Sequence, residues 1–87
     1  MLRIERSGNG EVVLILIGRM DAENVADLKT LCRSQAKGRR IVLDLKDLTL
    51  VDRDAVRFLE RCEAGSIRLT NCPAYIREWI KSERRAE

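Results

Sequence analysis

The first part of the chain shows the hydrophobic pattern of a β-hairpin. Leu2 and Ile4 alternate with charged residues, as in a half-exposed edge strand, whereas residues 12–17 form a continuous apolar run typical of a central strand. Residues 7–10, Ser-Gly-Asn-Gly, contain the Asn-Gly pair that favours a tight turn between two strands. We therefore expect the first strand to lie antiparallel to the second, at the edge of a sheet.

A helix is predicted to follow this hairpin. Residues 18–21, Gly-Arg-Met-Asp, break the apolar run, and Asp21 is a good N-cap. Lys37 and Gly38 give a basic last turn followed by a glycine suited to a left-handed C-terminal cap. The apolar stripe of this helix recurs at helical spacing and consists of Val25, Leu28, Cys32 and Ala36.

Residues 40–59 hold the most informative part of the sequence. Residues 41–45 form a short apolar run typical of a buried strand, and residues 46–50 mix charge and leucine without a period, which predicts that the chain leaves the sheet there. Asp52 then precedes a predicted helix over residues 53–64, which Gly65 ends as a left-handed cap. A polar turn is thus expected at the carboxyl end of a strand, where open α/β sheets bind their ligands and partners.

The last part of the chain predicts a short strand over residues 66–70 and a third helix. Asn71 is the expected cap of this helix, and Pro73 is expected in its first turn. Its apolar stripe is Ile76, Trp79 and Ile80, and its outward residues are Glu78, Lys81 and Glu83. Residues 82–87 are charged and are expected to fray as a tail behind a single domain of residues 1–81.

The order of elements, β-β-α-β-α-β-α, predicts an α/β fold. Strand-helix-strand units with right-handed crossovers give a small, mostly parallel four-stranded sheet with one antiparallel edge strand. Eighty-seven residues suffice for one domain with a thin core, so association into a homodimer would help to stabilise it.

Composition narrows the class of protein. The net charge of +3 comes from interspersed charges of both signs, and only 3% of residues are aromatic, a pattern that does not favour nucleic-acid binding. The longest apolar run is too short to span a bilayer, and the chain opens without a secretory leader, so we expect a cytoplasmic protein without membrane insertion. The three cysteines, Cys32, Cys62 and Cys72, are expected to be reduced and mostly buried on apolar helix faces.

The sequence offers few parts for catalysis. It contains no histidine and no glycine-rich phosphate loop, so we expect neither an enzyme nor a cofactor. A small-molecule or nucleotide binder is a further alternative. Several carboxylates could approach one sheet edge and hold a divalent cation, although caps and solvated loop residues explain them more simply: Asp21, Asp44, Asp47, Asp52 and Asp54.

Three motifs together resemble the STAS domain family, which includes anti-sigma-factor antagonists and the cytoplasmic domains of sulfate transporters. They are Gly-Arg-Met-Asp at residues 18–21, Ile-Val-Leu-Asp-Leu at residues 41–45 and Val-Asp-Arg-Asp-Ala at residues 51–55. In antagonists of this family the third motif contains an Asp-Ser-Ser-Gly turn, and a partner kinase phosphorylates its second serine. By this resemblance Asp52 matches the family aspartate, while Arg53 and Asp54 stand in place of the two serines.

The residues of this turn allow two interpretations. In the first, Asp52 caps the helix and Asp54 offsets the positive end of its dipole, together stabilising the fold by about 1–2 kcal/mol. In the second, Asp54 supplies a fixed negative charge where relatives carry a removable phosphate, and a partner reads that charge. A carboxylate has one charge and two acceptors, so it mimics a phosphate only in part.

The predicted function is therefore that of a protein-interaction module in bacterial regulation, without a serine phosphoswitch. The resemblance implies an anti-sigma-type or kinase-type partner, and the alternative is a small subunit docking in a lipid or anion transport assembly. The expected partner-binding residues lie on the turn at residue 21, on the turn of residues 52–54 and on the exposed side of the helix over residues 53–64: Asp21, Asp52, Arg53, Asp54 and Arg57.

A first prediction concerns phosphorylation of this turn. Because Arg53 and Asp54 replace the hydroxyl-bearing residues, no kinase-dependent phosphate should be found between Val51 and Leu59. Mass spectrometry of the protein purified from its native host checks this. A phosphate on that peptide would show that the residue matching is wrong.

Overall fold

The structure is a computed structural model that describes residues 1–8, 10–35 and 38–86. Predictions made for Asn9, Ala36, Lys37 and Glu87 lie outside the described residues. The elements in chain order are β1 (Leu2–Ser7), β2 (Val12–Met20), α1 (Ala22–Gln35), β3 (Ile41–Asp44), β4 (Leu48–Val51), α2 (Arg53–Ala64), β5 (Arg68–Thr70) and α3 (Ala74–Ala86).

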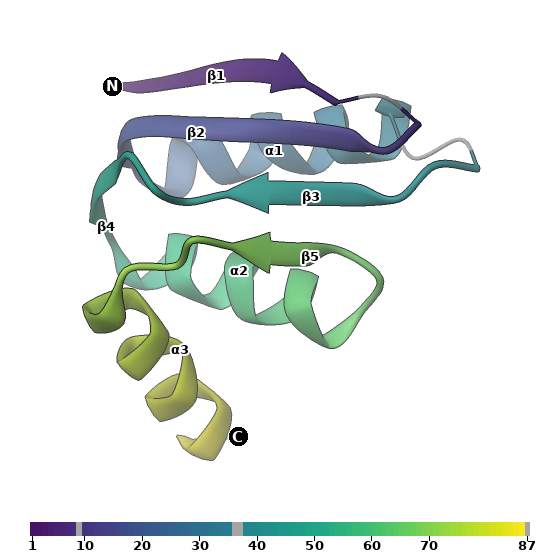
Figure 1. The fold of residues 1–87 in the computed structure, drawn as a ribbon. Coiled ribbons are helices and arrows are strands. Elements are labelled where there is room, and N and C mark those ends of the chain that lie inside the picture. Colours follow the sequence, from purple (N-terminus) through teal and green to yellow (C-terminus); the bar gives the residue numbers. More distant parts are fainter. Residues whose placement is uncertain (9, 36–37, 87) are drawn as a thin grey trace.

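The strands form one mixed sheet, which confirms the predicted α/β fold. Its main path is β1-β2-β3-β5, with β4 paired to β2 beside it. The β1–β2 hairpin is antiparallel and puts β1 at the edge, as expected, whereas all other pairs are parallel (Figure 1). The parallel pairs follow from the right-handed crossovers that α1 and α2 provide between strands.

Within the described residues the sheet has five strands rather than the predicted four. The expected break at residues 18–21 is wrong, because β2 continues to Met20, and the expected exit at residues 46–50 is wrong, because β4 rejoins the sheet. The nine-residue β2 is long enough to pair with β3 along its first half and with β4 along its second. Leu48 drives this return, since its side chain is only 3% exposed.

Gly18 makes the second half of β2 possible. The register between β2 and β4 shifts between Gly18 and Arg19, and Gly18 has a φ of +99°. A Cβ atom at this position would lie 2.7 Å from the backbone oxygen of Met1. Only glycine combines this left-handed conformation with such a close approach of another chain segment.

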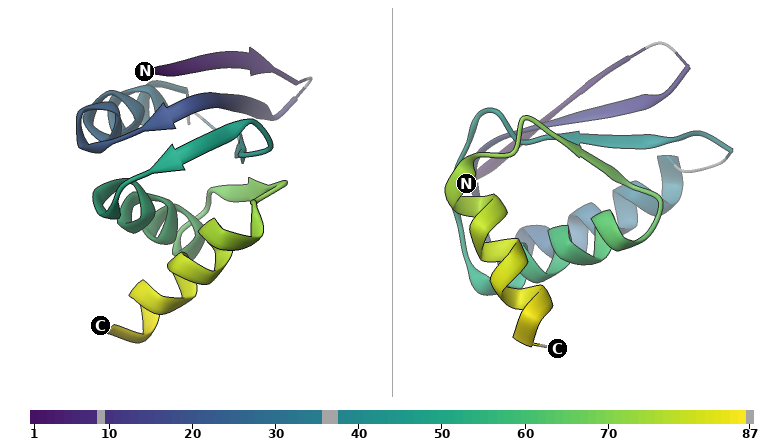
Figure 2. Two further views of the ribbon diagram at one scale, coloured as in Figure 1. Left: turned by 90° about the vertical axis from the view of Figure 1, so that its left-hand side faces the viewer. Right: turned by 60° about the horizontal axis from the view of Figure 1, so that its bottom comes forward.

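The helices α1 and α2 lie on the same face of the sheet, and α3 packs against α2 (Figure 2). The buried core joins the inward residues of the central strands to the apolar stripes of the three helices. Its largest fully buried side chains are Leu14, Leu16, Met20, Leu28, Leu43, Leu45, Leu59, Ile76 and Ile80, together with Val12 and Val56. Burial of this apolar surface is the main term that stabilises the fold.

The ends of α2, β5 and α3 differ from the sequence expectations. Gly65 has a φ of −91° and is therefore not a left-handed cap, although its N–H still donates to the carbonyls of Arg61 and Cys62. The last strand is shorter than residues 66–70 and covers Arg68–Thr70. Asn71 does not cap α3, because the helix begins three residues later at Ala74; its side chain donates to Asp44 Oδ1 at 3.2 Å instead.

Residues 82–86, for which a frayed tail was predicted, continue α3 in the structure. Pro73 precedes this helix rather than lying in its first turn, and its carbonyl accepts from the N–H of Arg77. Glu83 was expected to face solvent but is only 8% exposed. Charged pairs, rather than apolar anchors, hold this last turn against α2.

Ion pairs link α3 to α2 along their whole contact. Arg77 makes two hydrogen bonds to the carboxylate of Glu63 at 2.6 and 2.7 Å. Arg84 approaches Glu63 at 3.0 Å and the buried Glu60 at 3.5 Å. The hydrogen bond from Arg77 lowers the pKa of Glu63, so this stabilisation is present above the usual pKa of the carboxyl and is lost as the pH falls through the lowered value.

The cysteines are free thiols in two environments. Cys32 on α1 and Cys62 on α2 are buried as predicted, and burial raises the pKa of Cys62 to about 12. Cys72 departs from the prediction, because it precedes α3 and is only partly buried. A loop thiol lacks the cover that a helix stripe receives from the sheet.

The second prediction follows from this difference. A maleimide reagent reacts with thiolates, so Cys72 should be labelled first and Cys32 and Cys62 much more slowly. Peptide mass spectrometry over a time course measures the three rates, with the urea-unfolded chain as a control in which all three react quickly. Labelling of Cys62 as fast as Cys72 in the folded protein would contradict the buried position.

Candidate functional site

Asp52 links the N-termini of two helices through one carboxylate. Its Oδ1 accepts the N–H of Ala55 at 2.8 Å, which makes Asp52 the N-cap of α2 as predicted. Its Oδ2 accepts the N–H of Ala22 at 3.1 Å, in the first turn of α1. Two helix ends that are thirty residues apart in sequence are therefore held together by a single side chain.

Asp21 caps α1 in the same region. Its Oδ1 accepts from the N–H groups of Glu23 at 3.1 Å and Asn24 at 3.4 Å, and Asn24 Oδ1 accepts from the N–H of Asp21 at 3.0 Å. This reciprocal arrangement corresponds to a capping box with asparagine in the third helical position. The carboxylates of Asp21 and Asp52 are thus both engaged by backbone N–H groups.

Asp54 lies two residues further on and has a different environment. It is in the first turn of α2 and its side chain is exposed, as predicted. It makes no hydrogen bond or ion pair with any residue that the structure describes, since Asp52 already occupies the cap position. Among the described parts of the turn, Asp54 therefore presents a carboxylate that the fold itself does not bind.

Arg53 and Arg57, the two remaining predicted site residues, face α3. Arg53 Nε donates to Glu83 Oε1 at 2.9 Å, and Arg57 Nε lies 4.0 Å from the same oxygen. Both arginine side chains remain about half exposed or more, at 63% and 46%. The structure therefore brings Asp21, Asp52 and Asp54 together at the helix starts, and turns the two arginines toward α3.

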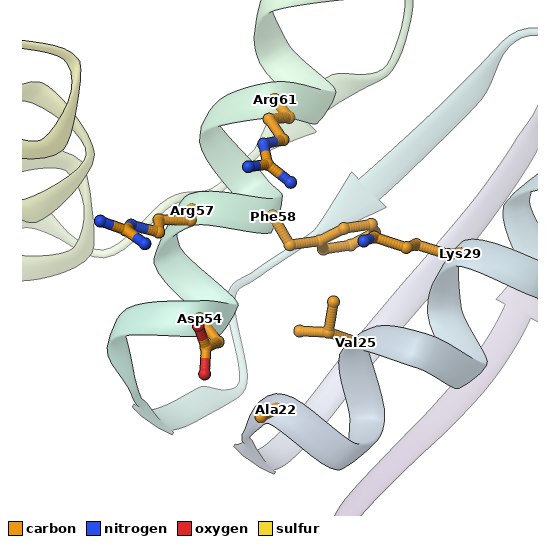
Figure 3. A pocket seen from close by; sticks show the side chains of 7 residues that line it. All are labelled: Ala22, Val25, Lys29, Asp54, Arg57, Phe58 and Arg61. Carbon is orange, nitrogen blue, oxygen red and sulfur yellow. The ribbon is translucent and has the colours of Figure 1, made fainter. Parts of the chain in front are cut away.

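A groove between α1 and α2 contains residues that the sequence reasoning missed. It has a volume of about 200 Å³ and is lined by Ala22, Val25, Lys29, Asp54, Arg57, Phe58 and Arg61. In Figure 3 the side chain of Lys29 extends from α1 toward Phe58, while Arg57 extends away toward α3. Helical spacing from Asp54 to Arg57, Phe58 and Arg61 is a signal that could have placed these residues on one side of α2.

Three large apolar side chains are exposed near β4. Met1, Leu50 and Tyr75 have exposed fractions of 103%, 58% and 49%. The hydroxyl of Tyr75 donates to the carbonyl of Thr49 at 2.6 Å, and the carbonyl of Met1 accepts from Arg19, which pairs with Leu50. Leu50 therefore exposes an apolar side chain on the strand that leads into Asp52 and Tyr75 lies beside it, whereas Met1 is on the other side of β2.

The divalent-cation alternative finds no assembled ligand set. Asp44 accepts from the N–H of Lys46 at 3.0 Å and from the side chain of Asn71 at 3.2 Å, so local hydrogen bonds occupy it. Within residues 1–8, 10–35 and 38–86, no three carboxylate, cysteine or histidine side chains come close enough to hold a metal. Nor does any helix in the described ranges have the length and apolarity needed to cross a membrane.

Comparison with solved structures identifies the fold. The chain superposes on the anti-sigma factor antagonist SpoIIAA in its unphosphorylated form with a TM-score of 0.64, at 19% identity, covering 93% of this chain and 82% of that one. An uncharacterised DUF3478 protein with a SpoIIAA-like fold, from Shewanella loihica PV-4, gives a TM-score of 0.57 at 17% identity, covering 99% and 75%. No protein-family model and no curated protein matches the chain. The chain thus has the SpoIIAA-like, STAS-type fold that its motifs predicted.

The third prediction tests the role of Asp52 at the starts of both α1 and α2. Asp52→Ala removes acceptors from both helix starts and should lower the free energy of unfolding by about 2 kcal/mol, at roughly 1 kcal/mol for each cap. Urea unfolding followed by circular dichroism measures the loss. Asp54→Ala is the matched control, because it removes a carboxylate two residues away that makes no such bond. Equal losses in the two variants would contradict the bridging role of Asp52.

Proposed function

We propose that this protein is a non-catalytic protein-interaction module in bacterial cytoplasmic regulation, of the anti-sigma-factor-antagonist type but without a serine phosphoswitch. The interaction surface comprises the Asp21 turn, the turn of residues 52–54 and the exposed side of α2 around Arg57. Its partner is a protein of the anti-sigma or kinase type. The fold shared with SpoIIAA, an anti-sigma factor antagonist, supports a regulatory role of this kind.

The environment of Asp54 is the observation that carries this proposal. In the resemblance noted above, Asp54 matches the phosphorylated serine of the family. The fold does not need this carboxylate as a cap, because Asp52 binds the N–H of Ala55. A charge that is exposed, fixed and not engaged by the described residues is available to a partner.

The remaining predicted residues divide between support and contact. Asp21 and Asp52 position the helix starts; both oxygens of Asp52 accept backbone N–H groups, whereas Asp21 accepts them at Oδ1. Arg53 and Arg57 share Glu83 and keep about half or more of their side chains in solvent. The exposed apolar side chains of Leu50 and Tyr75 add contact area close to the turn.

Because residues 52–54 contain no serine, the charge at this turn is constant rather than switched by phosphorylation. A carboxylate carries one negative charge, less than a phosphate, and this charge is neither added by a kinase nor removed by a phosphatase. The protein therefore holds one binding state, and its cellular concentration sets how much partner it occupies. This distinguishes the proposed role from a switch set by phosphorylation.

The fourth prediction tests whether a partner reads Asp54. Asp54→Ser and Asp54→Ala should change the affinity for the partner captured from the native host by about tenfold, which corresponds to about 1.4 kcal/mol. Their free energies of unfolding should change by only about 0.3–1 kcal/mol, the size of a helix-dipole effect. Calorimetric titration with the purified partner and urea unfolding measure the two quantities.

Asp27→Ser is the matched control, since Asp27 is an exposed aspartate on α1 outside the turn. It should bind the partner like the parent. If both Asp54 variants also bind like the parent, Asp54 acts only at the helix start and the proposed function fails at this residue.

A further inference from the structure

The groove between α1 and α2 is built around two unpaired cations. Lys29 comes from α1 and Arg61 from α2, and neither forms an ion pair with a residue that the structure describes. The neighbouring Arg53, Arg77 and Arg84 are instead all paired to glutamates between α2 and α3. The fold thus neutralises the arginines at its α2–α3 contact and leaves the groove positive.

The floor of this groove is apolar. Phe58 is only 6% exposed, and Val25 is partly buried against the core. An apolar floor between two cations suits a ligand that combines a hydrophobic side chain with carboxylates on either side. Burying the apolar group there excludes water, which strengthens the attraction between the charges at the rim.

The groove is too small to be a typical binding site for a drug-sized ligand. Its volume of about 200 Å³ lies below the roughly 300–1,000 Å³ of typical small-molecule sites. It accommodates one or two side chains projecting from a protein segment. Figure 3 shows the lining side chains of the groove, which come from α1 and from α2.

The two ends of the groove carry opposite charges. Asp54 lies among its lining residues near the starts of the helices, whereas Lys29 and Arg61 lie further along α1 and α2. Arg57 is between them but shares Glu83 at 4.0 Å, so it contributes less positive charge. A bound segment would therefore place its acidic part over Lys29 and Arg61 and keep its carboxylates away from Asp54.

We propose that the groove between α1 and α2 binds an acidic segment of the protein partner, with an apolar side chain on Phe58 and carboxylates on Lys29 and Arg61. This inference rests on the proposed function and specifies its partner chemistry. It assigns Lys29 and Arg61 as contact residues additional to those at the turn. The positive net charge of the chain, +3, favours the same kind of partner over long range.

The fifth prediction tests this with a defined probe. A short fluorescent peptide of glutamate and leucine should bind the full chain, and a lysine-and-leucine peptide of the same length should not. Lys29→Glu combined with Arg61→Glu should weaken binding of the glutamate peptide at least about tenfold, and added salt should weaken binding to the parent. Fluorescence anisotropy measures the affinities, and circular dichroism confirms that each variant folds.

The matched control reverses two exposed arginines outside the groove, Arg68→Glu with Arg85→Glu, so the net charge changes equally. This control should keep most of the peptide binding, because only the distributed charge has changed. Equal loss in both double variants would overturn the proposal in favour of nonspecific attraction. Tighter binding of a single-stranded oligonucleotide than of the glutamate peptide would also overturn it.

Binding of the native partner separates the two proposals. If the partner binds the Lys29 and Arg61 double variant like the parent but loses affinity for the Asp54 variants, the groove inference fails and the proposed function stands. If the Asp54 variants bind like the parent while the glutamate peptide requires Lys29 and Arg61, the groove inference stands and the role of Asp54 fails.

Discussion

The two hydrogen bonds of Asp52 are the constraint on which the arrangement of the site depends. One carboxylate accepts from the first turns of both α1 and α2, so the starts of the two helices are fixed relative to each other. The backbone N–H of Asp52 also donates to the carbonyl of Met20 at the end of β2. Asp52 therefore connects the end of β2 to the starts of both helices that border the groove. A residue of this kind is structural even though it lies within the predicted interaction surface.

The second organising feature is the set of ion pairs between α2 and α3. Glu60 and Glu83 are each about 8% exposed, and burying such carboxylates is costly unless cations compensate them. Arg53, Arg57 and Arg84 provide that compensation. The same pairs determine which positive charges remain for other molecules, because an arginine held by a glutamate attracts a partner less strongly. The charge available to a partner is thus set by internal pairing rather than by the number of basic residues.

Much of this fold could be predicted from the sequence, and the predictions that failed have a common cause. The hairpin, the three helices and the caps at Asp21 and Asp52 follow from local signals, and all are present. The strand β4 was missed because Leu48–Val51 is only four residues long and directly follows the charged residues Lys46 and Asp47. It pairs with the second half of β2, where the register shifts between Gly18 and Arg19. The burial of Glu83 was missed for a similar reason, as its hydrogen-bond partner Arg53 lies thirty residues away at the start of α2. Contacts between residues far apart in the sequence determine both features, and local sequence patterns do not encode such contacts.

The separation of Asp52 and Asp54 by two residues gives the two carboxylates different roles. The N-cap position directs the side chain of Asp52 back to the backbone N–H groups of the two helix starts, which bind both of its oxygens. The second helical position directs Asp54 outward, at the end of a groove whose other lining charges are positive. Because α2 turns about 100° per residue, Arg57, Phe58 and Arg61 follow Asp54 on neighbouring positions of one side. The carboxylate of Asp52 thus caps α2 and has a structural role, whereas Asp54, Arg57, Phe58 and Arg61 of the same helix line the groove.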